Sequence, residues 1–124
     1  MKPRIIAGIY AIMVGLGIGV AWGYYAVADS IFGIHPATEG IGYHIAAELM
    51  AAAFAVISGA ALLSNRSWGR KTYLIFMGML LYALINSPGY YRGRAAVPML
   101  IVFGVSLIFA IPLTIIGFNL KGKK

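Results

Sequence analysis

The stretch HPATEGIGYHIAAE, residues 35–48, separates the first long apolar run of the chain from the second. It contains both histidines and two of the three acidic residues of a 124-residue chain that is 61% hydrophobic. The spacing His-x-x-x-Glu occurs twice in it, at His35/Glu39 and at His44/Glu48, and the second copy leads directly into an apolar run. The rest of the chain is readily interpreted as scaffold that places these rare polar groups at one depth of a membrane.

The composition points to the lipid bilayer. A mean hydropathy of +0.88 with 10% charged residues lies outside the range of soluble globular proteins. The net charge of +7 comes from basic residues in short segments between and beyond the apolar runs. This placement indicates membrane topology and contact with anionic lipid, and it argues against a nucleic-acid partner. The chain has no cysteine, which excludes disulfides, thiolate metal sites and cysteine nucleophiles.

Four apolar runs predict an all-α integral membrane protein, a single domain over residues 1–124 that forms a four-helix transmembrane bundle. Each run is close to the roughly 20 residues that cross the hydrocarbon core. The third run is short and is expected to gain a turn from residues 67–71, with Ser67 as its N-cap. The predicted spans are about 5–27, 43–63, 72–87 and 97–118.

The connections carry further predictions. Residues 30–34 are apolar enough to form a short interfacial helix in the first outer loop. Gly40 and Gly42 are expected to interrupt any helix before the second span begins. The third span should end at Asn86-Ser87-Pro88-Gly89, which is a strong stop signal. Pro112 lies inside the fourth span and is expected to kink it.

The lysines and arginines predict the topology. Two of them, Arg92 and Arg94, fall on one side of the predicted spans, and eight fall on the other: Lys2, Arg4, Arg66, Arg70, Lys71, Lys121, Lys123 and Lys124. Because basic residues concentrate in cytoplasmic segments, both termini are predicted to lie in the cytoplasm. The protein is predicted to lie in the cell (plasma) membrane.

Small residues recur at every fourth position of the first two spans. The first span has Ala7, Ala11, Gly15, Gly19 and Gly23, and the second has Ala47, Ala51, Ala55 and Gly59. Such stripes allow helices to approach closely in lipid. The favoured interpretation packs the two stripes against each other within one protomer, because sequential helices of a short-looped bundle are usually neighbours. The alternative makes one stripe a homo-oligomer contact.

Glu48 is the leading candidate for a functional residue. At ~1.5 Å per residue it lies roughly 6–9 Å below the outer membrane boundary, where an ionisable group is costly and should face protein or water. His44 is four residues earlier and therefore on the same helix face. The two side chains could share a proton, orient each other or bind one metal ion. The structural alternative is that Glu48 only ties helices together.

A divalent metal is the cofactor that these residue types would suit. Two histidines and two carboxylates, from His35, Glu39, His44 and Glu48, match the ligand preferences of zinc, iron, manganese or copper. In one straight helix the two pairs would point in opposite directions, so convergence requires a fold at Gly40-Ile41-Gly42. A solvated loop is the favoured interpretation of His35 and Glu39.

The third span supplies candidate walls for a binding site. It runs outward, so Tyr82 and Asn86 lie at heights comparable with Glu48 and His44. For Asn86, a helix C-cap and a partner of Glu48 are equally favoured. Most aromatic residues at this level, Trp22 among them, are interpreted as the interfacial belt. The inner half of the membrane has hydroxyl groups but no acidic or basic side chain, which argues against a pump or an open pore.

Three functions remain open at this point. The favoured one is a small membrane protein with an outward-facing polar pocket, formed by Glu48, His44, Asn86 and Tyr82, that binds a cation, a metal or a small ligand. The others are a non-catalytic accessory or assembly subunit of a larger membrane complex, and an oligomeric proton- or cation-coupled transporter. The expected partners are the bilayer and either further copies of the chain or a larger complex. An enzyme is disfavoured, because no nucleophile with a nearby base is evident.

Overall fold

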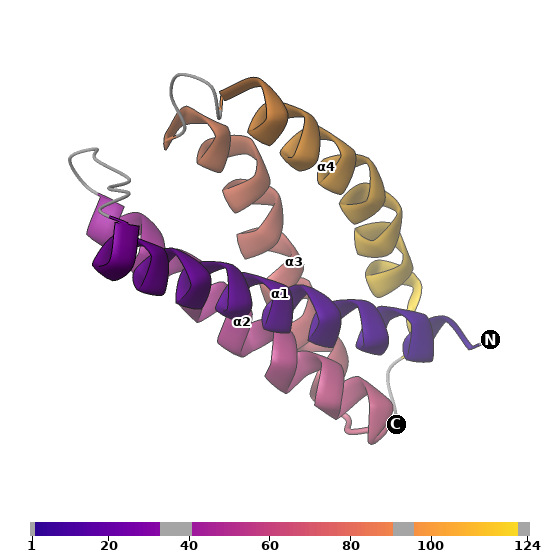
Figure 1. Cartoon of the computed structure of the whole chain (residues 1–124). Coiled ribbons are helices and arrows are strands. Elements are labelled where there is room, and N and C mark those ends of the chain that lie inside the picture. Colours follow the sequence, from indigo (N-terminus) through magenta and orange to yellow (C-terminus); the bar gives the residue numbers. More distant parts are fainter. Residues whose placement is uncertain (1, 33–40, 91–95, 122–124) are drawn as a thin grey trace.

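The computed structural model describes residues 2–32, 41–90 and 96–121, and all secondary structure within these ranges is helical. The elements are α1 (Pro3–Phe32), α2 (Ile41–Leu63), α3 (Gly69–Asn86), the short 3₁₀ helix η1 (Ser87–Tyr90) and α4 (Ala96–Asn119), shown in Figure 1. Four of them contain stretches long and apolar enough to cross a membrane: Pro3–Val27, Gly42–Leu63, Gly69–Gly89 and Val97–Asn119. The predicted all-α fold with four candidate membrane spans is confirmed.

Some features of the connections differ from those predicted. α1 continues to Phe32, so residues 30–32 extend the first helix rather than forming a separate interfacial helix, and residues 33 and 34 lie outside the described ranges. Gly42 lies inside α2, which begins at Ile41, so this glycine does not interrupt the helix, and Gly40 lies outside the described residues. The predicted stop signal after the third span is confirmed, because α3 ends at Asn86 and Ser87 opens η1. Pro112 lies within α4, which remains helical on both sides of it.

The turn between α2 and α3 explains why Ser67 is not the N-cap of the third helix. Asn65 adopts the left-handed conformation (φ 55°), its N–H donates to Leu62 O, and the N–H of Arg66 donates to Ala61 O at 2.8 Å. This pattern is a Schellman motif that ends α2. It directs the chain so that Trp68 occupies the N-cap position of α3 without a side-chain cap.

α1 and α2 lie side by side along most of their length (Figure 1). Ala7, Ala11 and Ala55 are fully buried. A Cβ on Gly15 would lie 2.8 Å from Ala52 O, and one on Gly59 would lie 2.7 Å from Gly8 O. The inner part of the two small-residue stripes, which also includes Ala51, therefore forms the α1–α2 contact within one protomer. In the outer part, Gly19 and Gly23 are exposed, and a Cβ at either position would touch nothing within 4 Å.

α3 packs between α2 and α4, and its core residues are Tyr73, Phe76 and Met77, all fully buried. Three hydrogen bonds tie α4 to α3. The Tyr73 hydroxyl donates to Leu113 O at 3.1 Å, and Arg70 donates to Gly117 O at 3.3 Å and to Phe118 O at 2.8 Å. All three acceptors lie in the last two turns of α4.

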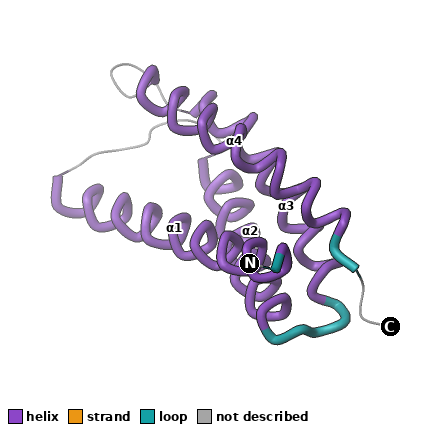
Figure 2. The backbone as a smooth tube through the Cα atoms, turned by 90° about the vertical axis from the view of Figure 1, so that its right-hand side faces the viewer, coloured by secondary structure: helices purple, strands orange, loops and turns teal. Residues whose placement is uncertain are grey.

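The four helices follow one another around the bundle, but α1 and α4 meet only over a short stretch. Toward the end where α3 stops, α1 and α4 stand apart from each other, as Figures 1 and 2 show from two directions. The start of α1, the end of α4 and the α2–α3 turn lie at the opposite end (Figure 1). We call this the basic end, because it holds Arg66 and Arg70, and the other the Glu48 end.

Candidate functional site

His44 and Glu48 form the predicted pair on one face of α2. The distance between His44 Nε2 and Glu48 Oε1 is 3.3 Å, and the two side chains are 4% and 13% exposed. The i, i+4 spacing of an α-helix brings them together without any contribution from the other helices. The pair therefore follows directly from the local sequence.

Two hydrogen-bond donors reach the same carboxyl group from other elements. Trp22 on α1 donates its indole N–H to Glu48 Oε2. Ser87, fully buried at the start of η1, donates its hydroxyl to Glu48 Oε1 at 2.8 Å. The indole nitrogen can only donate, so Oε2 must act as an acceptor. Glu48 thus links α1, α2 and the end of α3 through one carboxyl group.

The electrostatic setting of Glu48 is unusual for a membrane span. Its eighth position in α2 puts it about 10 Å from the start of the helix. No lysine or arginine of the described residues lines the cavities that Glu48 faces. A carboxylate in such surroundings is expensive unless a proton, a cation or hydrogen-bond donors compensate it. Trp22 and Ser87 donate to its oxygen atoms and His44 Nε2 lies 3.3 Å from Oε1, but of these groups only a protonated His44 would balance its charge.

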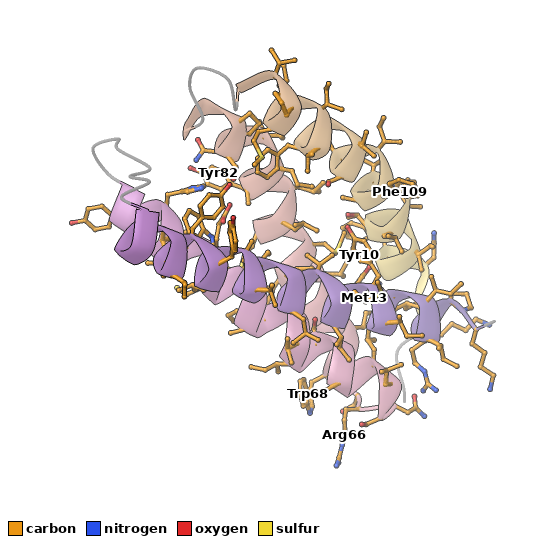
Figure 3. All side chains as sticks on the ribbon, in the orientation of Figure 1. Tyr10, Met13, Arg66, Trp68, Tyr82 and Phe109 are labelled. Carbon is orange, nitrogen blue, oxygen red and sulfur yellow. The ribbon has the colours of Figure 1, made fainter. Side chains whose placement is uncertain are left out.

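Glu48 lines two cavities at once. The first, which we call the α1–α4 cavity, has a volume of about 820 Å³ and is bordered by α1, α3 and α4. The second, the α2–α3 pocket, has a volume of about 320 Å³. All four predicted ligand-binding residues line the α2–α3 pocket: His44, Glu48, Tyr82 and Asn86. Tyr82 is largely exposed and lies at the Glu48 end, far from Arg66 and Trp68 (Figure 3).

The α1–α4 cavity is mostly apolar and rich in aromatic rings. Its aromatic lining residues are Tyr10, Trp22, Tyr24, Tyr25, Phe103 and Phe109. Trp22 stands next to Tyr25 with ring centroids 5.8 Å apart, and next to His44 at 6.0 Å. The carboxyl group of Glu48 is its only acidic lining group among the described residues. An apolar chamber with aromatic walls and one carboxyl group suits a ligand that carries a positive charge on an apolar body.

The predicted metal ligands fall into two sets. His35 and Glu39 lie outside the described residues. Among the residues that the structure describes, no three histidine or acidic side chains gather in one place. His44 and Glu48 remain the two described members of the predicted metal site, and each is already engaged in the hydrogen-bonded cluster.

Trp22 and Ser87 are the two site residues that the sequence interpretation missed. The sequence pattern predicts an interfacial-belt position for Trp22 and only a stop signal at Ser87. A signal for Trp22 existed: it lies seven residues, or two turns, after Gly15, and Glu48 lies seven residues before Ala55. Because Gly15 and Ala55 face each other, the same faces bring Trp22 to Glu48. Ser87 had no comparable signal.

Fold and site together define a class: a helical protein with four candidate membrane spans and a hydrogen-bonded glutamate cluster between them. The chain belongs to the family described as Domain of unknown function (DUF8058), whose model matches residues 1–124. No curated protein and no solved structure matches the chain.

Proposed function

We propose that this chain is an integral protein of the cell membrane that binds an amphipathic organic cation in the α1–α4 cavity. In this proposal both termini are cytoplasmic, as the distribution of lysine and arginine favours, and Glu48 faces the outer half of the bilayer. The positive group of the ligand lies at Glu48 and its apolar body lies between α1 and α4. The observation that carries the proposal is that the one intramembrane acidic side chain described opens onto a large aromatic cavity.

Three features favour a cation over other ligands. The volume of about 820 Å³ is in the range of sites for drug-sized molecules. The faces of Trp22 and its tyrosine neighbours attract a positive charge, by about 0.5–2 kcal/mol per ring. A bound cation would also balance the charge of Glu48, which no described lysine or arginine does.

Binding is favoured over transport by the groups that lie further in. Ser58 donates to Ala55 O at 3.0 Å and Thr114 to Ala110 O at 2.8 Å, so each hydroxyl is bonded to its own helix. Between Glu48 and the basic end, the described parts of the spans contain no further acidic or basic side chain. A continuous ion path normally needs such groups across the whole thickness. Transport would require a second protomer that supplies the missing part of the ion path.

The test uses the tryptophan that touches Glu48. In a Trp68→Phe background Trp22 is the only tryptophan, so its fluorescence reports on the site. Titration of the detergent-solubilised protein with tetraphenylphosphonium should quench this fluorescence in a saturable way, and the neutral analogue triphenylphosphine oxide should bind at least tenfold more weakly. Glu48→Gln should lower the affinity for the cation by tenfold or more, or about 1.4 kcal/mol.

Matched variants separate the cavity from general effects. Asp29→Asn also removes one negative charge, but at a position beyond the Pro3–Val27 span, and it should leave the affinity for the cation unchanged. Gly17→Leu adds a side chain to a wall of the cavity, where a Cβ meets nothing within 4 Å, and should weaken binding while Glu48 stays in place. Gly19 does not line the cavity, so Gly19→Leu is the control for Gly17→Leu. Equal cation binding by wild type, Glu48→Gln and Gly17→Leu would refute the proposal.

A further inference from the structure

A second cavity lies at the basic end of the bundle, far from Glu48. It has a volume of about 540 Å³ and forms where the start of α1, the α2–α3 turn and the end of α4 come together. Five basic side chains of the described residues line it: Lys2, Arg4, Arg66, Arg70 and Lys121. They come from three segments that are far apart in the sequence. We call this cavity the basic pocket.

No acidic side chain of the described residues lines the basic pocket. Arg70 is engaged with the carbonyl groups of Gly117 and Phe118, where its charge also complements the negative end of the α4 dipole. The other four basic side chains make no hydrogen bond or ion pair with any described residue. Several positive charges that share one pocket repel one another, so the pocket favours an anion.

The N-terminus of α1 adds to this preference. Pro3 and Arg4, its first two residues, line the pocket. The positive end of the helix macrodipole therefore faces the same space as the basic side chains, which favours a phosphate or similar group there.

The remaining walls identify the kind of anion. Leu62, Ile116 and Leu120 line the same pocket beside the charged groups. Leu62 and Ile116 belong to two of the candidate membrane spans, so this apolar surface borders the acyl-chain region. A ligand that fills both parts has a phosphate group and a hydrocarbon chain. We propose that the basic pocket binds the phosphate group of an anionic phospholipid from the leaflet at the basic end.

This site is independent of the cation site, because none of its lining residues borders the α1–α4 cavity. The test is native mass spectrometry of the full chain, titrated with dioleoylphosphatidylglycerol and, separately, with dioleoylphosphatidylcholine. The wild type should bind the anionic lipid preferentially. Arg4→Gln with Arg66→Gln should lower its affinity roughly 25-fold, at roughly fivefold for each basic residue near the lipid charge.

Lys71→Gln is the matched control. Lys71 is exposed at the same end and does not line the pocket, so its loss should change the affinity less than twofold. Arg70 is kept, because it also holds α4. If the melting temperature of the first double variant falls, Arg66→Gln with Lys121→Gln replaces it, since both side chains are exposed.

Three outcomes would overturn the proposal. Equal losses in the double variant and in Lys71→Gln would show that only net charge matters. Equally tight binding of phosphatidylcholine would show that the pocket does not select an anion. Displacement of the lipid by inorganic phosphate at equal concentration would assign the pocket to free phosphate rather than to a lipid.

Discussion

Trp22 donates its indole N–H to the carboxyl group of Glu48 across the α1–α2 interface, although the two residues are 26 positions apart in the sequence. The same carboxyl group accepts a hydrogen bond from Ser87, which follows α3. The carboxyl group of Glu48 thus connects α1, α2 and the segment that follows α3. The stability of the bundle should therefore depend on each donor.

Trp22→Phe keeps an aromatic ring but removes the donor to Oε2. We expect it to lower the free energy of unfolding in detergent by about 1–2 kcal/mol, because a carboxyl oxygen in apolar surroundings then lacks its partner. The measurement is reversible unfolding in mixed micelles. Trp68→Phe, at the exposed start of α3, is the control and should change the value by less than about 0.5 kcal/mol. Equal effects of the two substitutions would contradict this role of Trp22.

Ser87→Ala removes the donor to Oε1 from a fully buried position. We expect a loss of stability of about 1–2 kcal/mol in the ligand-free protein. Ser106→Ala is the matched substitution, because the Ser106 hydroxyl bonds only to Val102 O of its own helix at 2.8 Å. Thermal unfolding in detergent measures both variants, and Ser106→Ala should leave the stability nearly unchanged. A stable Ser87→Ala protein would show that Glu48 does not need this donor.

Gly15→Val tests the close approach of α1 and α2. An added side chain would collide with Ala52 O and Val56, each 2.8 Å from the new Cβ, so we expect a loss of about 1–3 kcal/mol or a changed helix crossing. A Cβ on Gly19, one turn further along the same stripe, would touch nothing within 4 Å, so Gly19→Val should leave the monomer as stable as wild type. If Gly19→Val instead weakens association of copies in a crosslinking assay, the outer part of the stripe is an oligomer contact.

Gly117→Ala tests how α4 is seated on α3. The new Cβ would lie 2.7 Å from the ring of Tyr73, whose hydroxyl bonds to Leu113 O. We expect the melting temperature to fall by several degrees, which corresponds to about 1–3 kcal/mol. Gly104→Ala, in the open part of the same helix, should be neutral or stabilising by up to about 1 kcal/mol. A fall in both variants would mean that α4 tolerates no alanine for reasons unrelated to Tyr73.

The sequence was sufficient for those features that depend on local spacing. Long apolar runs predicted the four candidate spans, and the i, i+4 rule predicted that His44 and Glu48 would meet. Helix boundaries were less accurate, because the Schellman motif at Asn65 and the extension of α1 to Phe32 depend on how the chain turns between helices. The choice of Trp22 and Ser87 as partners of Glu48 depends on how each helix is rotated about its axis. Hydropathy carries no information on that rotation. Among the sequence patterns, only the small-residue stripes indicated which faces of α1 and α2 meet.

The hydrogen bonds that tie α4 to α3 are confined to one end of α4. Its bonds to Arg70 and Tyr73 lie within its last two turns, whereas its first turns border the aromatic cavity. A sideways swing of those first turns would break none of these bonds, and lipid tails would replace the apolar contacts that it gives up. In the proposed function, such a displacement of α4 about its last two turns would let a ligand dissolved in the bilayer reach Glu48 without first passing through water.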